Sequence, residues 1–488
     1  MNITKFIKKI THHCNSTFVN PIVFEIKTET TAIRFTYLVF ISAIMLMPIT
    51  SSASVKNAAS CSYSDVSAAY SSASAGDTVA VPAGNCTWSS TLIITKAITL
   101  QGAGSSSTVI TNSMSSGSSL ISITPASDAI LTRVTDIGFQ LGSLNNGRRA
   151  ITINGKPKVS FFPTKIRIDH NAITGGGGNP GGIVTSGTTY GLIDHNTFTN
   201  VYSAIFGWGI GYDNQAWIDA YNAGGILAGT ANAMFVEDNI FILNDSAGTR
   251  ITVDAQIYLQ EGGASYVVRY NTFDASAVTN PNFMTLMYNN HGNQDYCVNY
   301  PGTCFRGMPI FESYNNNAKC AANNCEFESI RGGSVLIHDE TFSGGSGSVV
   351  KVSEEECWQP AFFSPLRTAW PAQDQVTNSF FWNLTFNGNP VTDIKIGGEN
   401  GSCAGTFIQK NRDYFMHAPQ ASGGITLFTG TRYGGSQTVP TTGDVGSMTF
   451  SSTGSNAYYP YTPYIYPHPL TREAAVTLES PSTLRILN

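Results

Sequence analysis

One short pattern recurs along this chain and constrains its fold more than any other feature. An apolar residue, a charged residue, one further residue, an Asn and then apolar positions appear in RIDHNAIT, LIDHNTFTN, FVEDNIFILN and VVRYNTFDAS. Weaker copies follow in FESYNNNA and VLIHDETF. Similar short units at unequal intervals are typical of a solenoid whose coils carry loops of variable length. We therefore predict stacked coils of short strands, each burying the face of its neighbour.

Alternation along these strands assigns the two faces. Successive side chains of a strand point to opposite sides, so residues two apart share a face. Three residues before the Asn stands an apolar set, predicted to face the interior: Ile168, Ile193, Val236 and Val268. Two residues before it stands a charged set, predicted to face outward: Asp169, Asp194, Glu237 and Arg269. We expect the Asn residues themselves to stack as an amide ladder at a corner: Asn171, Asn196, Asn239 and Asn271.

Composition and the first residues favour an exported β protein. Of 488 residues, 47 are Gly and only 12% are charged, which suits stacked strands and turns better than solvated helices. A basic opening precedes the uncharged run FTYLVFISAIMLM, which ends at Met47 before small residues. This predicts a signal peptide with a long leader over residues 1–53. The alternative is a membrane anchor, but the run is shorter than the roughly 20 residues that span a bilayer.

Charge and cysteine content support the same compartment. Residues 1–53 hold 5 basic and 2 acidic residues, so 22 basic and 30 acidic residues remain, a net charge of −8. Without a basic stripe to neutralise phosphates, we exclude nucleic acid as a partner. Eight Cys residues remain after the leader, an even number without metal-type CxxC pairs, which favours disulfides. Proximity favours these pairs, although sequence leaves the connectivity open: Cys61–Cys86, Cys297–Cys304, Cys320–Cys325 and Cys357–Cys403.

Several segments resemble a known superfamily. The opening CSYSDVSAAYSSASAGDTVAVPAGNCTW, together with GGASYVVRYNTF, RGMPIFESYNN and IRGGSVLIHDETF, resembles the pectate-lyase-like right-handed parallel β-helix proteins. The resemblance implies an all-β right-handed parallel β-helix with a short N-terminal capping helix over residues 60–395. It also implies an irregular C-terminal tail over residues 396–488 that packs on the coil or caps it. Because one fold hosts many functions, the resemblance is weaker for the reaction than for the fold.

The outward charged column is the first candidate site. Adjacent strands lie about 4.8 Å apart, so Asp169, Asp194 and Glu237 would repel one another unless a cation or shifted pKa values compensate. Carboxylates with water suit Ca²⁺, and we expect these three residues as its ligands. In pectate lyases an Arg is the proposed base, and Arg269 matches it by position, with Arg306 or Arg331 neutralising the substrate carboxylate. The pectate lyase motif itself is not matched residue by residue, and the very high pKa of Arg argues against a base.

The inserted loops supply further candidates. His291 and Arg306 lie on a Cys-bearing insertion, and we expect them to join Arg269, Glu237 and Asp254 in one groove. For substrate binding we name Glu312 and the aromatic residues Trp208, Tyr212 and Trp217, which suit stacking on sugar rings. A glycoside hydrolase would instead use two opposed carboxyls, with Asp254 and Glu312 as the candidates.

Each candidate also has a structural interpretation. The acidic column is explained equally by solvated strand residues, Arg269 by an ion pair with Glu237, and Arg331 by a tight turn with the two following Gly residues. His170 and His195, beside the ladder, are expected as corner residues bonded to backbone.

From these features we predict a secreted, monomeric carbohydrate-active β-helix protein without a stable membrane anchor after cleavage. The leading hypothesis is a polysaccharide lyase-like protein acting on an acidic polysaccharide, with Ca²⁺ as a candidate cofactor. The alternatives are a noncatalytic extracellular adhesin or matrix protein of the same fold, and a glycoside hydrolase.

Overall fold

The structure is a computed structural model, and the residues that it describes form a set of ranges along the chain. These are 53–124, 130–143, 146–155, 165–176, 181–187, 189–208, 228–244, 251–253, 255–260, 266–278, 281–283, 285–291, 311–321, 325–345, 348–353, 376, 379–397, 408–411, 413–419 and 461–472. They belong to one compact unit that starts at Ala53.

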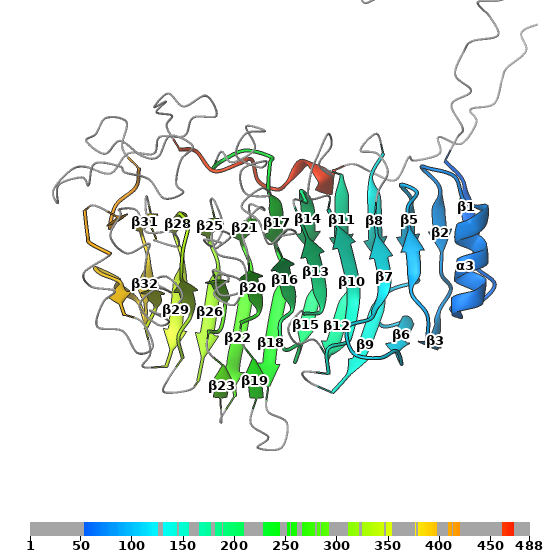
Figure 1. Cartoon of the computed structure of the whole chain (residues 1–488), viewed down its shortest axis with the longest axis horizontal. Coiled ribbons are helices and arrows are strands. Elements are labelled where there is room, and N and C mark those ends of the chain that lie inside the picture. The colour runs from blue at the N-terminus through cyan, green and yellow to red at the C-terminus, as the bar shows by residue number, and fades with distance from the viewer. Residues whose placement is uncertain are drawn as a thin grey trace, which may run out of the picture. The chain divides into compact units, whose positions relative to one another are not determined.

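Three long sheets of parallel strands run the length of this unit (Figure 1). Sheet A holds β1 (Val55–Asn57), β2 (Thr78–Ala80), β5 (Thr99–Gln101), β8 (Thr132–Thr135), β11 (Ile166–Asp169), β14 (Gly191–Asp194), β17 (Met234–Glu237), β21 (Tyr266–Arg269), β25 (Phe311–Tyr314), β28 (Val335–His338), β31 (Ser379–Trp382) and β35 (Tyr414–Phe415). Sheet B holds β3 (Gly84–Trp88), β6 (Thr108–Asn112), β9 (Gly138–Gly142), β12 (Ala172–Gly175), β15 (Thr197–Thr199), β18 (Ile240–Asn244), β22 (Thr272–Ala277), β26 (Asn317–Cys320), β29 (Thr341–Gly344), β32 (Thr385–Phe386) and β33 (Asn389–Pro390). Sheet C holds β4 (Leu92–Ile94), β7 (Ser119–Ile123), β10 (Arg149–Asn154), β13 (Ile183–Ser186), β16 (Ile205–Trp208), β20 (Ile257–Gln260), β24 (Tyr288–His291), β27 (Glu328–Ile330), β30 (Val350–Val352) and β34 (Lys395–Ile396).

The chain visits the sheets in the order A, B, C along most of its length, so each circuit adds one strand to every sheet. The fold is a right-handed parallel β-helix, as predicted. A separate pair, β19 (Ile251–Val253) and β23 (Pro281–Phe283), joins two of the connections. Strand pairing in sheet A continues to β35, beyond residue 395.

The predicted register of the repeats is confirmed. Ile168 pairs with Ile193, Ile193 with Val236, and Val236 with Val268, and all four side chains are fully buried in the main core. A second interior file lies on sheet B, where Phe198, Phe241 and Phe273 stack with ring centroids 4.8 and 4.5 Å apart. Apolar side chains from all three sheets therefore fill the coil.

The amide ladder at the A–B corner is also confirmed, and it extends by one rung to Asn316. From β11 to β32, two residues separate each strand of sheet A from the next strand of sheet B. The first has a positive φ, for example 54° at His170, and from Asn171 to Asn316 the second is a ladder Asn. From Asn171 to Asn271, each ladder Nδ2 donates to the next ladder Oδ1 and to backbone carbonyls. The corner thus satisfies polar groups that would otherwise be buried without partners.

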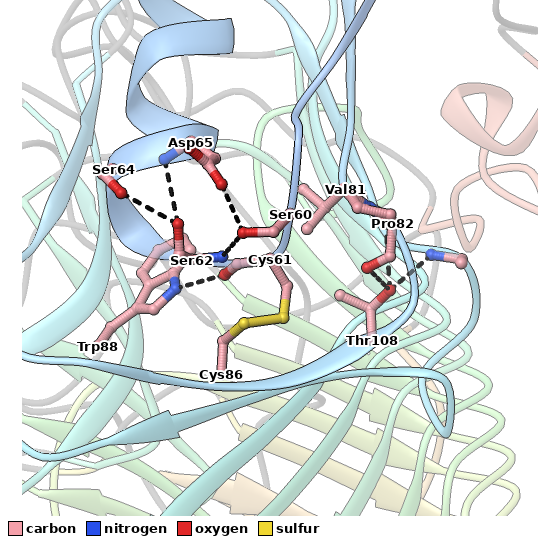
Figure 2. The surroundings of a disulfide bond; sticks show 11 residues. Ser60, Cys61, Ser62, Ser64, Asp65, Val81, Pro82, Cys86, Trp88 and Thr108 are labelled. Carbon is pink, nitrogen blue, oxygen red and sulfur yellow. Dashed lines mark hydrogen bonds between the residues drawn. A yellow bond between two sulfur atoms is a disulfide. The ribbon is translucent and has the colours of Figure 1, made fainter.

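The first coil is covered by helix α3 (Tyr63–Ser72), as expected for a capping helix (Figure 1). Ser62 caps its N-terminus by accepting from the backbone N–H of Asp65. A disulfide joins Cys61 to Cys86 of β3, and the Trp88 indole N–H donates to the Cys61 carbonyl at 2.9 Å (Figure 2). The predicted Cys61–Cys86 pair is therefore confirmed, and it ties the start of the cap to the coil.

The predicted Cys320–Cys325 disulfide is confirmed as well. The other two proposed pairs involve Cys297, Cys304, Cys357 and Cys403, which lie outside the described residues. Within the described part of the chain, no helix is long and apolar enough to cross a membrane.

A segment near the C-terminus lies on the outer face of sheet A. We call residues 461–472, which include the short helix η1 (Pro469–Thr471), the C-terminal strap. Tyr464 and Leu470 join an apolar cluster with Leu192, Phe235 and Val267, whose side chains face away from the coil's interior. Figure 1 shows this segment, in red, beside the ends of the sheet A strands. The strap gives this part of sheet A a second, smaller core outside the coil.

Candidate functional site

The predicted charged column exists, but its charges are paired and buried. Asp169, Asp194, Glu237 and Arg269 occupy matching positions on β11, β14, β17 and β21, and each side chain is fully buried. The Arg269 guanidinium contacts the Glu237 carboxylate at 2.6 Å. Asp194 accepts from the Arg167 guanidinium at 2.7 and 2.9 Å, and Asp169 accepts from the Arg133 Nε at 2.7 Å. The ion-pair interpretation of Arg269 is therefore correct.

The C-terminal strap covers the column. Arg269 donates to the carbonyls of Tyr464 and Ile465, and Arg167 lies 3.4 Å from the carbonyls of Leu470 and Thr471. The backbone N–H of His468 donates to the second oxygen of Glu237. The expectation of an open groove around Arg269 is wrong, because a distant segment of the same chain fills it.

The column does not fit the predicted Ca²⁺ site. Its three carboxylates, those of Asp169, Asp194 and Glu237, already accept from guanidinium groups. Both oxygens of each Asp accept from a guanidinium, with the corner histidines bonded to the Oδ2 atoms as well, and the second oxygen of Glu237 accepts from the strap. Nowhere in the described residues do three His, Cys, Asp or Glu side chains gather as a metal site. A cation here would have to displace arginines from a buried position.

The two corner histidines stack on each other. Their rings are parallel, with centroids 5.0 Å apart, and each Nδ1 bonds to the buried carboxylate that precedes it. Hydrogen bonding to Asp194 raises the pKa of His195 above its ordinary value. His170 and His195 are corner residues as expected, although their partners are carboxylates and not backbone groups.

Glu312 also lies under the strap. On β25 it lies in the row next to the charged column, where it pairs in register with Val267 of β21. Its carboxylate accepts from the Gly229 N–H at 2.9 Å and from the Tyr461 hydroxyl at 2.8 Å. Burial raises its pKa to about 7. Both of its carboxyl oxygens accept hydrogen bonds from the protein, so the side chain does not present a free carboxyl to a polymeric substrate. Its predicted role in substrate binding is not supported by this position.

The outer face of sheet C has a different character. Its central row runs through Val184, Phe206 and Tyr258 and continues in register through Asn289, Ser329 and Lys351. The neighbouring row, Ile183, Ile205, Ile257, Tyr288, Glu328 and Val350, faces the interior, and the apolar members and Tyr288 belong to the main core. Alternation therefore places the central row on the outside of the coil. Phe206 and Tyr258 stack there, with ring centroids 5.2 Å apart.

Two polar residues of this row lack partners. Asn289 is fully buried, and neither atom of its amide has a hydrogen-bond partner. The Ser329 hydroxyl, on the adjacent strand, is likewise buried without a partner. Leaving a buried polar group unpaired costs about 1–3 kcal/mol, so such groups commonly mark a position where a ligand, ion or water completes the bonding. The two groups sit side by side, because Asn289 and Ser329 are paired in register.

Cationic side chains follow along the same sheet. Lys351 Nζ lies 3.5 Å from the Glu326 carboxylate, and burial raises the pKa of Glu326. Arg331, one of the predicted catalytic residues, follows β27 directly and is buried, with its backbone N–H donating to the Asn290 carbonyl. Asn289, Ser329, Lys351 and Arg331 thus gather amide, hydroxyl and cationic groups on three consecutive strands.

The predicted residues do not converge in one site. Arg269 and Glu237 lie on the outer face of sheet A, whereas the strands of Trp208 and His291 belong to sheet C. Interior side chains fill the space between these sheets: the Tyr266 hydroxyl of β21 reaches Thr185 of β13 across the coil. The groove drawn around both Arg269 and His291 is therefore wrong. Asp254, Arg306, Tyr212 and Trp217 lie outside the described residues, as do the side chains of Trp208 and His291.

Comparison with known proteins adds two distant structural likenesses. No family model matches this chain, and no curated protein matches it. It is similar to the alginate lyase from Paenibacillus sp. str. FPU-7, with 12% identity over 71% of this chain and 98% of that chain and a TM-score of 0.42. It is also similar to the ORF18 protein of Geobacillus virus E2, with 14% identity over 68% of this chain and 56% of that chain and a TM-score of 0.29. The parallel β-helix described above rests on the strand pairing of this chain itself.

Proposed function

We propose that this protein binds an acidic polysaccharide on the outer face of sheet C and cleaves it by β-elimination. The observation that carries the proposal is the row of Asn289, Ser329 and Lys351, in which buried polar atoms without partners adjoin a cation. An elongated polymer suits a row that runs across successive strands. The stacked pair of Phe206 and Tyr258 continues the same row at its N-terminal side.

The chemistry of elimination matches these groups. The reaction removes the proton at C5 of a uronate, breaks the C4–O bond and leaves a C4–C5 double bond. It therefore requires neutralisation of the adjacent carboxylate, a base that takes the C5 proton, and an acid that protonates the leaving oxygen. We assign neutralisation to Lys351 and Arg331, and hydrogen bonding to the sugar or its carboxylate to Asn289 and Ser329. His291, two residues beyond Asn289 on β24, is our candidate base, because an imidazole titrates near neutral pH.

The same composition argues against a glycoside hydrolase. Hydrolysis needs two opposed carboxyls flanking the scissile bond. Among the described residues of this face, the row offers amide, hydroxyl and cationic groups, and the carboxyl of Glu326 is engaged by Lys351. The hydrolase pair proposed from the sequence is also not assembled, because Glu312 lies under the strap on sheet A.

The test is an ultraviolet assay with purified protein on a panel of acidic and neutral polysaccharides. Elimination produces an unsaturated sugar that absorbs in the ultraviolet, and we expect this signal with an acidic polymer only. Lys351→Met and Asn289→Ala should each lower the rate by about tenfold or more, a loss of about 1.4 kcal/mol of transition-state stabilisation. Lys319→Met is the matched control, because Lys319 is an exposed lysine on sheet B.

Two results would count against the proposal. Rates unchanged by both sheet C substitutions would place the reaction elsewhere on the molecule. Retention of an acidic polymer that depends on Lys351, without any ultraviolet product, would make the protein an adhesin or matrix protein using the same face. Thermal unfolding of each variant separates loss of function from loss of fold.

A further inference from the structure

The chain enters the coil at β1, and the residue before this strand is bonded to a buried carboxylate. The Ser54 backbone N–H and the Ser54 hydroxyl each donate to Asp77 Oδ1 at 2.8 Å. The Ser54 carbonyl accepts from the Thr78 N–H at 2.9 Å. Asp77 directly precedes β2 and is only 3% exposed. Ser54 is therefore held through its backbone nitrogen, its side chain and its carbonyl.

The surroundings of Asp77 favour a negative charge on its carboxyl. Its second oxygen, Oδ2, accepts from the Ser74 N–H at 2.8 Å, and this hydrogen bond lowers the pKa of the carboxyl below its ordinary value. Lys56 Nζ lies 3.9 Å from Oδ2, which is longer than a hydrogen bond. A buried carboxylate is stabilised most by a cation that donates to it directly. The nitrogen of Ser54 already lies where such a cation would have to be.

The sequence before Ser54 has the pattern of a signal-peptidase site. The uncharged run of the leader ends at Met47, and a short polar stretch follows. Ser51 and Ala53 then place small residues at the third and first positions before the Ala53–Ser54 bond, as a signal peptidase requires. The sequence therefore permits cleavage directly before the residue that Asp77 holds.

A second pair of small residues, Ala58 and Ser60, has the same spacing, and the fold decides between the two positions. Cleavage after Ser60 would remove β1, which pairs in register with β2. It would also remove the hydrogen bond that the Ala58 N–H donates to the Ala80 carbonyl. Cleavage of the earlier bond leaves sheet A complete, which favours the earlier position.

We propose that a signal peptidase cleaves the Ala53–Ser54 bond and that the new α-ammonium group of Ser54 forms an ion pair with Asp77. Hydrolysis breaks the C–N bond and places the hydroxyl of water on the Ala53 carbonyl carbon and the remaining hydrogen on the Ser54 nitrogen. The proton of the new acid then passes to the new amine, which leaves a carboxylate on the released peptide and an ammonium on Ser54. An α-amino group carries this charge at neutral pH. Processing thus converts an amide hydrogen bond of 2.8 Å into an ion pair that fastens the first strand of sheet A to the residue before β2.

The competing explanation is that Asp77 only shapes the turn that leads into β2. Its backbone N–H donates to the Ser74 carbonyl while its carboxylate accepts from the Ser74 N–H, which is a self-contained turn. In that case a charge on Ser54 would add nothing to stability. The two explanations predict different stabilities for chains that begin at different residues.

The first measurement identifies the N-terminus. The full chain with its own leader is expressed in a secreting host, and the exported protein is analysed by intact mass and N-terminal sequencing. We expect Ser54 as the first residue. An exported chain that begins at another residue, or that keeps residues 1–53, would refute the cleavage position.

The second measurement tests the ion pair. Two chains are exported behind the same host signal peptide, one beginning at Ser54 and one at Ser51, so that the charged amino group is moved by three residues. Ser54 is half-buried and partly exposed ion pairs contribute modestly, so we expect the folding equilibrium constant in chemical denaturation to be about fivefold higher for the chain beginning at Ser54. Asp77→Asn should abolish this difference between the two chains. Asp65→Asn, a matched change in the cap at a residue bonded to Ser60, should preserve it. Equal equilibrium constants for the two unmodified chains would refute the ion pair.

Periodate oxidation supplies a readout that needs no variant. Periodate cleaves an N-terminal Ser between its amino-bearing and hydroxyl-bearing carbons, and both of these groups of Ser54 donate to Asp77. The folded chain beginning at Ser54 should therefore react at least about fivefold more slowly than the same chain in denaturant. Equal rates would refute the ion pair even if Asp77→Asn does not fold. None of these readouts involves a polysaccharide, so their outcome is independent of the proposed function.

Discussion

Replacing Arg269 by Ala should destabilise the fold, and the structure allows the size of the effect to be worked out. Arg269 is fully buried between sheet A and the C-terminal strap. Its guanidinium contacts Glu237 at 2.6 Å, donates to the Tyr314 hydroxyl and to two strap carbonyls, and lies 4.8 Å from the centroid of the Phe235 ring. Alanine removes all of these contacts at once.

The dominant cost is the charge left behind on Glu237. Removing one partner of a buried ion pair typically costs about 3–5 kcal/mol, because the other charge stays buried without compensation. The carbonyls of Tyr464 and Ile465 also lose their donors, which adds to the cost and loosens the strap. We therefore expect Arg269→Ala to lower the free energy of unfolding by about 3–5 kcal/mol.

The assay is chemical denaturation followed by Trp fluorescence, with limited proteolysis to detect release of the strap. The double variant Arg269→Met, Glu237→Leu is the informative control, because replacing both members of a buried pair by apolar residues is often neutral or stabilising. It should recover most of the lost stability. If Arg269→Ala instead loses less than about 1 kcal/mol and abolishes polysaccharide cleavage, the column is a functional site and not a structural one.

Two further predictions concern pH and the N-terminal cap. Burial raises the pKa of Glu312 from 4.5 to about 7. As the pH rises, this carboxyl therefore loses its proton in the unfolded state before it does so in the folded state. The free energy of unfolding should fall by about 3 kcal/mol between pH 4.5 and 7 through this residue. Glu312→Gln should flatten that part of a pH–stability curve, and a curve unchanged by the substitution would contradict the raised pKa of Glu312. Replacing Cys61 and Cys86 by Ser should lower the free energy of unfolding by about 3 kcal/mol and expose helix α3 to proteolysis first, whereas uniform cleavage along the coil would show that the cap and the coil unfold together.

The sequence was sufficient for the coil because its determinants are local and repeated. Ile193 and Asn196 identify an interior position and a corner without reference to any distant residue, and the same spacing returns in each coil. Alternation then fixes which residues face inward. The Cys61–Cys86 disulfide could also be predicted, because its two cysteines lie close to each other in the sequence.

Burial of the charged column could not be predicted, because it depends on partners far along the chain. Arg269 and the Tyr464 carbonyl are 195 residues apart, and Arg167 and the Thr471 carbonyl are 304 residues apart. No periodicity links the strap to these positions. A column of outward charges therefore has the same appearance in the sequence whether solvent or a returning segment covers it.

The polar row on sheet C was missed for another reason. Asn289 and Ser329 lie in YNNH and ESI, which carry no repeated corner residue that would align them with each other. The connections into sheet C vary in length, so the register of its strands cannot be counted from the Asn motif. Alternation within each strand was the available signal, and it places Asn289 on the other side of the sheet from the interior Tyr288. Alternation could therefore have assigned Asn289 to the outer face, but it could not have identified Ser329 as its neighbour.

The two-residue corner between sheets A and B also determines where this protein tolerates added sequence. Successive ladder residues are separated by 25, 43, 32 and 45 positions, yet the corner itself stays the same length from β11 to β32. The differences in spacing therefore arise in the other connections of the coil. A peptide epitope or binding loop grafted into those connections should leave the scaffold intact. One residue inserted beside Asn239, in contrast, would shift Phe241 from the interior to the outer face and break the amide chain at the middle rung.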